Sequence, residues 1–169
     1  MSKSYGQLGI LAYLRGDYDA AEPLYRRSLE IFERIGDQAG MSKSYHQLGT
    51  LAQDRGDYDT AEPLYRRSLE IDERIGDQAG IATSYTVLGG LSETAGNLDQ
   101  AVAYRVDALA IRLQIGTASA ADVQPLIGLR RRLGRDRFRS AAIASGLNEE
   151  SAASLMQMLD QQQEETAGN

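Results

Sequence analysis

The sequence predicts an all-α protein that is built as a solenoid of helical hairpins. One observation is a repeat: residues 1–40 and 41–80 are identical at 34 of 40 positions, and residues 81–119 continue the series more loosely. Such self-similarity at a fixed period is typical of arrays whose units pack on their neighbours. The other observation is the spacing of apolar residues, which follows the period of a helix and gives no strand signal.

Each unit predicts two helices joined by a short turn. In the second unit the apolar stripe of the first helix runs over residues 42–55, and Gly56 is suited to end that helix. Asp57 then supplies a carboxylate that can cap the next helix, which ends at Gly76. We therefore expect three helix-turn-helix repeats, at residues 1–40, 41–80 and 81–119.

The residues that recur in these units resemble a known family. In the second unit the pattern consists of Tyr45, Leu48 and Gly49, then Gly56, Asp57, Tyr58, Ala61 and Tyr65, which is similar to the tetratricopeptide-repeat (TPR) signature. The run AEPLYRRSLEI, at residues 21–31 and 61–71, resembles the longer repeats of kinesin light chains and of arrays attached to bacterial signalling NTPases. Over about residues 1–116 the resemblance implies a right-handed helical solenoid whose first helices line a concave groove.

The C-terminal residues break the period. We expect a helical cap over residues 120–163, with helices at about 120–133 and 135–145 and a last helix that Asn148 caps and that runs to about 162. A terminal unit of a solenoid must present a polar outer side, which such an atypical segment provides. Residues 164–169 are expected to form a disordered tail.

Composition excludes several kinds of site. The 169 residues include no cysteine and one histidine, His46, so a disulfide framework, a thiolate site and a histidine metal cluster are excluded. Catalytic motifs are missing, and Asp17, Asp19, Asp57 and Asp59 lie where helix caps are expected. We therefore expect no enzymatic activity, cofactor or metal. The net charge of −6 disfavours nucleic acid, and the lack of a membrane-length apolar run indicates a cytoplasmic protein with no membrane partner.

The candidate binding residues come from the positions at which the first two units differ. Four of the six differences lie on one face of the first helix, nearly opposite its packing stripe: Gly6/His46, Ile10/Thr50, Tyr13/Gln53 and Leu14/Asp54. The TPR resemblance implies that this face lines the groove, although drift after duplication would leave the same pattern. The partner-binding candidates are Lys43, His46, Thr50, Gln53 and Asp54, with Lys3, Gly6, Ile10, Tyr13 and Leu14 in the first unit and Thr83, Thr86, Gly90 and Glu93 in the third.

Three functions are compatible with these features. The first is protein–protein interaction, with a peptide or helix of the partner on the concave TPR face, as part of a larger signalling or scaffolding protein. The second is a structural homo-oligomerisation module. The third is a nucleic-acid-associated regulator that uses the cluster Arg130, Arg131, Arg132, Arg135, Arg137 and Arg139. For this cluster we favour a solvated cap that complements carboxylates such as Asp122 and Asp136 and those of the acidic repeats, because the chain is acidic overall.

Self-association is a separate hypothesis for the N-terminal end. Four positions are apolar in the first unit and polar in the second, namely Ile10, Tyr13, Leu14 and Phe32. If these side chains lie together in water, they form an apolar surface of the kind that marks interfaces, most simply in a homodimer or against an upstream segment. The alternative is that Tyr13 and Leu14 fold back onto the second repeat.

Overall fold

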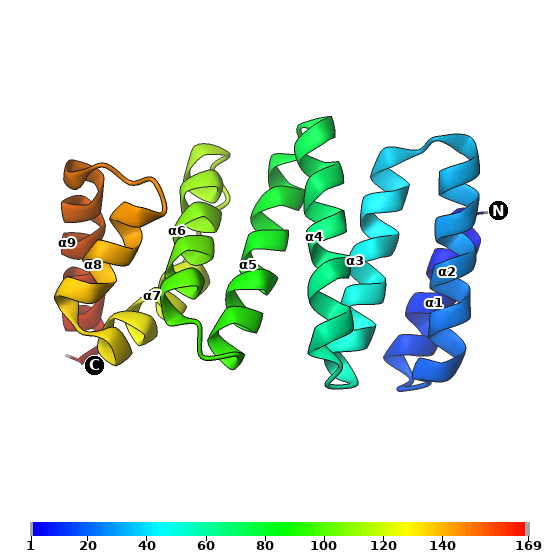
Figure 1. Ribbon diagram of the computed structural model, residues 1–169, viewed down its shortest axis with the longest axis horizontal. Coiled ribbons are helices and arrows are strands. Elements are labelled where there is room, and N and C mark those ends of the chain that lie inside the picture. The colour runs from blue at the N-terminus through cyan, green and yellow to red at the C-terminus, as the bar shows by residue number, and fades with distance from the viewer. Residues whose placement is uncertain (1, 168–169) are drawn as a thin grey trace. The chain divides into compact units, whose positions relative to one another are not determined.

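The computed structural model describes the backbone of residues 2–167 and the side chains of residues 4–163. Over this part of the chain the structure consists of nine α-helices and no strand, which confirms the all-α prediction (Figure 1). The six helices of the repeats are α1 (Ser2–Leu14), α2 (Tyr18–Ile35), α3 (Gln38–Asp54), α4 (Tyr58–Ile75), α5 (Gln78–Thr94) and α6 (Leu98–Gln114). The remaining three are α7 (Ala120–Leu133), α8 (Arg135–Ala144) and α9 (Glu149–Ala167). The chain divides into two compact units, residues 1–84 and 85–169, with the boundary inside α5.

Aspartates cap the N-termini of α2, α3 and α4, and glycines with positive φ lie at or just beyond the ends of the helices. The Asp57 carboxylate accepts the Thr60 N–H at 3.1 Å, as expected for a cap. Gly76 ends α4 with φ of +73°, a left-handed conformation that glycine adopts without strain. Asp37 caps in the same way, accepting the Gly40 N–H at 2.9 Å. Because of this additional cap, α3 begins at Gln38, earlier than the predicted residue 42.

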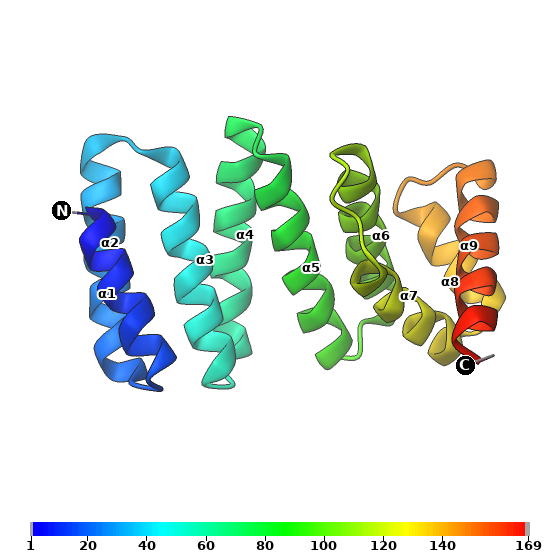
Figure 2. The same ribbon diagram turned by 180° about the vertical axis from the view of Figure 1, so that it is seen from behind.

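The first unit packs its helices in chain order, so that α1 contacts α2, α2 contacts α3, and α3 contacts α4. Its core joins Tyr25 of α2 to Leu48 and Leu51 of α3. Glycines let the helices of each hairpin approach closely: a Cβ at Gly49 would lie only 2.9 Å from the Tyr65 ring. In both views α1 and α2 lie side by side at the N-terminal end of this unit (Figure 1, Figure 2).

The second unit has its own core, shared by α6, α7, α8 and α9. Phe138, Leu126 and Leu159 are fully buried in it. Helix α7 occupies its predicted range, and Asn148 caps α9 by accepting the Ser151 N–H at 2.8 Å. Helix α9 then continues to Ala167, into the segment that was expected to be a disordered tail, and residues 168–169 lie outside the described residues.

Candidate partner-binding face

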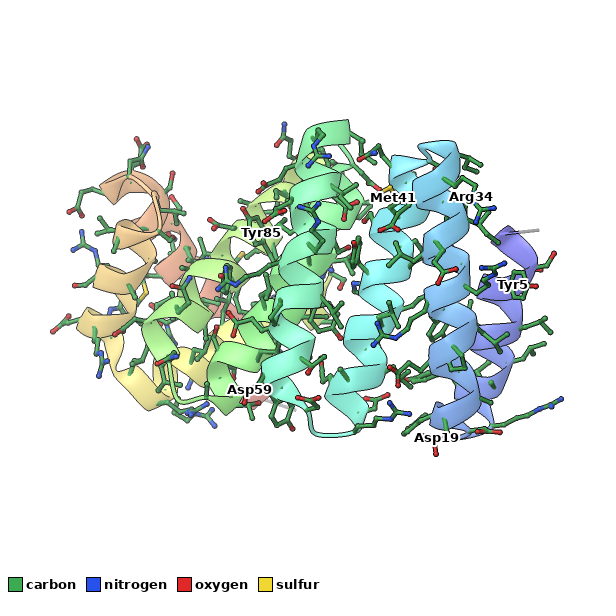
Figure 3. The ribbon with its side chains drawn as sticks, turned by 45° about the vertical axis from the view of Figure 1, so that its right-hand side comes forward. Tyr5, Asp19, Arg34, Met41, Asp59 and Tyr85 are labelled. Carbon is green, nitrogen blue, oxygen red and sulfur yellow. The ribbon has the colours of Figure 1, made fainter. Side chains whose placement is uncertain are left out.

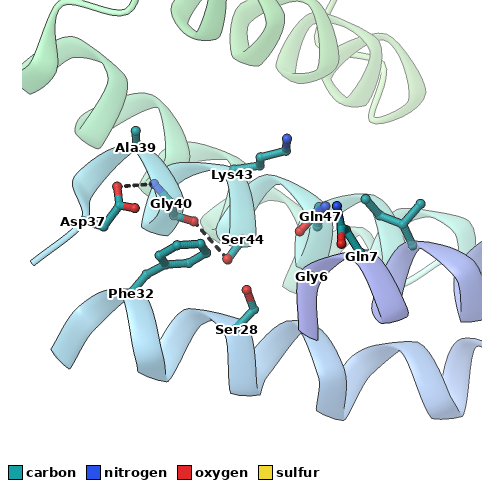
Figure 4. Close-up of a pocket in the computed structure, with 11 residues that line it drawn as sticks. Gly6, Gln7, Ser28, Phe32, Asp37, Ala39, Gly40, Lys43, Ser44 and Gln47 are labelled. Atoms are coloured by element: carbon teal, nitrogen blue, oxygen red, sulfur yellow. Dashed lines mark hydrogen bonds between the residues drawn. The ribbon is translucent and has the colours of Figure 1, made fainter. Parts of the chain in front are cut away.

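A hollow of about 480 Å³ opens in the first unit between α1, α2 and α3 (Figure 4). Gly6 and Ile10 line it from α1, Phe32 from α2, and Gly40 and Lys43 from α3. The structure thus brings three predicted binding residues, Gly6, Ile10 and Lys43, to one place. We call the surface that α1 and α3 present here the groove face, and it consists of Gly6, Gln7, Ile10, Lys43 and Gln47.

The Phe32 ring and two glycines determine the shape of the hollow. Phe32 packs directly against Gly40, where any Cβ would collide with the ring. The Gly40 backbone is fixed from both sides, since its N–H bonds to Asp37 and its carbonyl accepts the Ser44 hydroxyl at 2.9 Å. Gly6 leaves its side of the hollow open, and a Cβ there would lie at an ordinary 3.4 Å from the Ser28 hydroxyl oxygen.

The matching residues of the second repeat are arranged differently. The His46 ring packs on the Tyr65 ring, with centroids 5.2 Å apart, and burial lowers the pKa of His46. The Tyr65 hydroxyl lies 2.9 Å from the Gln53 amide oxygen and 3.2 Å from the Thr50 hydroxyl oxygen. These positions face Tyr65 of α4, whereas the stripe residues Leu48 and Leu51 pack on Tyr25 of α2, so the two sets lie on different sides of α3 as expected. His46, Thr50 and Gln53 are nevertheless half-buried against the second helix of their own hairpin.

Tyr13 connects the first two repeats. Its hydroxyl donates a 2.5 Å hydrogen bond to Asp54, and its ring stacks on Tyr18 at 5.7 Å. The hydrogen bond to Asp54, with a smaller contribution from burial, raises the pKa of Tyr13 to about 12. Tyr13 therefore follows the alternative in which it folds back toward the second repeat.

The apolar side chains exposed at the N-terminal end are not the four that the sequence predicted. Phe32 is buried, and Ile10 packs against the core of the first unit, whereas Leu14 is 72% exposed. The expectation that all four self-association candidates would lie in water is thus wrong, because α3 covers Phe32. Sequence reasoning missed Leu8 and Leu11, which are each 50% exposed. Their counterparts Leu48 and Leu51 could have pointed to them, because both belong to the apolar stripe of the first helix in the second repeat.

A buried carboxylate replaces the Phe32 ring in the second repeat. Asp72 is 3% exposed and lies against Gly80, as Phe32 lies against Gly40. The Ser42 hydroxyl donates to it at 2.5 Å and lies 3.0 Å from the Ser68 hydroxyl. Burial raises the pKa of Asp72 although the serine bonds lower it.

The remaining described candidates form contacts within the protein, although Thr83 is exposed. The Lys3 side chain lies outside the described residues. Thr83 donates its hydroxyl to the Ala79 carbonyl at 2.8 Å, and Thr86 is half-buried. In the second unit Glu93 accepts the Arg105 guanidinium at 3.1 Å, and the same guanidinium lies beside Gly90. Glu93 is therefore a partner of arginine within its own unit.

Five of the six arginines in the cluster form ion pairs with acidic residues of the second unit. Arg130 and Arg135 share Asp160 at 2.5 and 2.9 Å, and Arg137 binds Asp99 at 2.8 Å. Two further pairs are Arg132 with Glu93 and Arg139 with Glu149. Among the described residues Arg131 alone of the six has no ion pair.

Of the expected carboxylate partners of this cluster, the two named aspartates are wrong, whereas the third repeat supplies Glu93 and Asp99. Asp122 pairs with Arg112 and caps α7 through Ser119. No ion pair joins Asp136 to the cluster within the described part of the chain. The arginines instead lower the pKa values of Asp99 and Asp160, which lie far from them in sequence. Most of the charge that a nucleic-acid site would need is thus neutralised within the unit.

Two other kinds of feature are absent from the described residues. No group of three or more histidine or acidic side chains there is arranged to hold a metal ion. In the same part of the chain, no helix combines the length and the apolar content that a membrane span requires.

The repeat geometry can be compared with known proteins. A family model for the tetratricopeptide repeat matches residues 1–74 and 40–114. The chain belongs to the tetratricopeptide-repeat family. A search of curated proteins found no relative of this TPR chain by sequence.

Solved structures share the TPR-like solenoid fold. BtubC (BKLC) from P. vanneervenii has a TM-score of 0.70 and 23% identity, with 94% of this chain and 64% of BtubC covered. This chain thus spans less than two thirds of BtubC. A kinesin-light-chain-like protein of Podosopora anserina with nearly identical TPR-like repeats has a TM-score of 0.58 and 15% identity, with 97% and 95% covered. A variant of that protein gives 0.58 and 14%, with 99% and 96% covered.

Proposed function

We propose that the groove face binds an extended segment of another protein, and that an apolar side chain of this segment occupies the hollow. TPR folds generally serve as protein-interaction modules. The observation that carries the proposal is the hollow itself, which has an aromatic floor at Phe32 and a polar rim at Gln7, Lys43 and Gln47. Binding sites combine these properties, since apolar walls supply affinity and a few polar groups at the rim can bond a peptide backbone.

The outer side of the first unit offers a contrast that supports this choice of face. On α2 the exposed Arg26 and Arg27 pair with Glu22 and Glu30 at 2.8 and 2.6 Å. The same pairs recur on α4 at 2.7 and 2.6 Å. These side chains satisfy one another one helical turn apart, so they offer a partner little unpaired charge.

The proposal describes a binding protein and includes no catalytic step, because TPR solenoids are typically non-catalytic. It places the chain in the cytoplasm as part of a larger signalling or scaffolding protein, which the acidic composition and the repeat type support. The nucleic-acid alternative is not proposed, because the cluster at residues 130–139 is largely paired.

A displayed library of random peptides tests the proposal. Peptides selected on the chain are titrated against wild type and two variants that each borrow one residue from the second repeat. Gly6→His adds a ring at a residue that lines the hollow, and its Cβ fits at 3.4 Å from the Ser28 hydroxyl oxygen. Ala20→Thr is the matched control. It also replaces a residue of the first repeat by its counterpart in the second, Thr60, but Ala20 does not line the hollow. We expect Gly6→His to weaken binding by about tenfold or more while Ala20→Thr leaves it unchanged.

Thermal unfolding of both variants accompanies the titrations, so that a loss of binding is separated from a loss of fold. Selected peptides whose affinity is the same for wild type and Gly6→His would show that the hollow is not the site. Failure to select any peptide that binds the folded chain would refute the proposed function as a whole.

A further inference from the structure

The outer face of α1 carries the same three residues that dock α3 onto α2. In α3, Leu48 and Leu51 pack on Tyr25 of α2, and Arg55 follows one turn later. In α1 the equivalent residues are Leu8, Leu11 and Arg15. Figure 3 shows α1, labelled at Tyr5, at the outer edge of the first unit beside α2.

Burial differs sharply between the two sets. Leu48 and Leu51 are 4% and 1% exposed, while Leu8 and Leu11 are each 50% exposed. These two leucines lie on a different side of α1 from Gly6 and Ile10, because the two pairs of positions are centred about 150° apart around the helix axis. The surface is therefore separate from the groove face.

The docking of α3 on α2 also has an electrostatic part. The Arg55 guanidinium contacts Asp19 at 2.7 Å and Glu22 at 2.5 Å, both at the N-terminal end of α2. The hydrogen bonds from Arg55 and then from Arg26 lower the pKa of Glu22. Arg15 repeats the cation, yet it has no ion pair among the described residues. Two leucines and an arginine in this register are thus complementary to a helix that begins with acidic residues.

We propose that the outer face of α1, formed by Leu8, Leu11 and Arg15, docks a partner helix of the α2 type. Such a helix has carboxylates in its first two turns, and a small residue and an aromatic residue on the side that meets the leucines, as Ala21 and Tyr25 do in α2. The α2–α3 contact within the first unit is the template for this docking, because the two leucine-and-arginine faces are identical in sequence.

A second copy of this chain fits the same face less well. In a two-fold contact Arg15 would meet α1 of the copy, whose sequence SKSYGQLGILAYL contains no acidic residue. In a head-to-tail contact the copy would have to offer α2 or α4, but the small and aromatic residues of both helices, Ala21 and Tyr25 or Ala61 and Tyr65, are at most 2% exposed. Charge complementarity therefore selects the α2-type partner.

The test uses the full chain and a synthetic helix with the sequence of residues 17–36. A hydrocarbon staple between positions 23 and 27, both on the exposed side of α2, holds the peptide helical. Titration is followed by fluorescence anisotropy for wild type, for Leu8→Ser/Leu11→Ser and for Leu14→Asp. The last variant is the control, since Leu14 is more exposed than either leucine but lies outside the docking register, and Asp54 is its natural counterpart.

We expect the double variant to lose about tenfold or more in affinity and Leu14→Asp to bind as wild type does. A charge exchange then tests the register: Arg15→Glu should weaken binding, and a peptide carrying Asp19→Arg and Glu22→Arg should restore it. Circular dichroism confirms that every variant keeps its helices.

Three results would overturn the proposal. The first is that the peptide does not bind, and the second is that Leu14→Asp weakens binding as much as the double variant does. The third is that wild type alone sediments as a dimer and the double variant as a monomer, because a second copy would then occupy this face. None of these results bears on the peptide-binding role of the groove face.

Discussion

In the first repeat the Phe32 ring packs against Gly40, whereas in the second repeat the Asp72 carboxylate takes the same place against Gly80. The surrounding residues are nearly the same, since only six positions distinguish the two repeats. The glycine is needed in both, because each partner side chain lies too close for a Cβ. The comparison shows that one hairpin frame accepts an apolar or an ionisable residue at a buried position when small and polar neighbours are at hand.

The largest effect is expected from Phe32→Asp, which makes the first repeat resemble the second. The ring is 8% exposed, so its removal leaves a cavity and places a carboxyl group in it. We expect a loss of about 3 kcal/mol or more in the free energy of unfolding. Urea unfolding measures the change, with Ala20→Thr as control. An unfolding midpoint equal to that of wild type would mean that Phe32 is not part of the core.

The reverse exchange, Asp72→Phe, is expected to stabilise the protein by about 1 kcal/mol, because it removes a buried carboxylate from a place that fits a ring in the first repeat. Ser42 and Ser68 keep each other as partners at 3.0 Å. The same urea experiment detects the gain, and a destabilised variant would show that the serine–aspartate bonds outweigh the cost of burial.

Asp72 also predicts a pH dependence. Burial raises its pKa above the ordinary 3.8, so the folded state holds this proton over a range in which the unfolded state has lost it. Stability relative to Asp72→Asn is therefore highest below pH 3.8 and falls as pH rises through the folded pKa. Unfolding of both proteins across this range measures the difference, and a difference that grows in the opposite direction contradicts the assignment.

A smaller effect is expected at Tyr13, which bonds to Asp54 across the two repeats. Tyr13→Phe keeps the ring stacked on Tyr18 and removes only the hydroxyl, so we expect a loss of about 1 kcal/mol. Combining it with Asp54→Asn in a double-mutant cycle isolates the pair. Additive effects of the two changes would show that the hydrogen bond contributes nothing to stability.

The smallest effect concerns His46, where the first repeat has Gly6. Burial lowers the pKa of His46 below the ordinary 6.5, so its contribution to stability is present above pH 6.5 and is lost as pH falls through the folded pKa. Since the chain has one histidine, its proton NMR signals can be assigned without further variants. A titration midpoint at or above 6.5 would show that the ring is solvated.

Much of the fold could be predicted because it depends on local patterns. Helix spacing, the Asp57 cap and the Gly76 terminus are all readable within one repeat. The groove face was only partly predictable. The polarity of Asp72 favours an exposed position. In the structure its side chain is buried, and it accepts a hydrogen bond from Ser42, whose hydroxyl also bonds to that of Ser68. The same inference misplaced Phe32, since a buried acid is visible only once its hydrogen-bond partners are known.

The cap of the second unit shows a different limit. Its helices follow the sequence pattern, but the partners of its arginines lie far away in the chain. Arg137 binds Asp99, and Arg130 reaches Asp160 and Gln163. Nearby Asp136 was the more obvious choice by distance along the sequence. Such pairs depend on how the helices pack, which charge patterns do not determine.

Two hairpins of nearly equal sequence create a pairing problem while the chain folds, because α1 meets two similar partners, α2 and α4. The Gly9–Tyr25 and Gly49–Tyr65 contacts are of the same kind and offer no means of choosing between them. The Tyr13–Asp54 hydrogen bond distinguishes the two pairings, because the residues at the same positions one repeat later are Gln53 and Thr94, which differ from this pair. A chain with its neighbours in the wrong order forfeits this bond. The pair thus acts as a register mark that distinguishes correct assembly from a swapped arrangement.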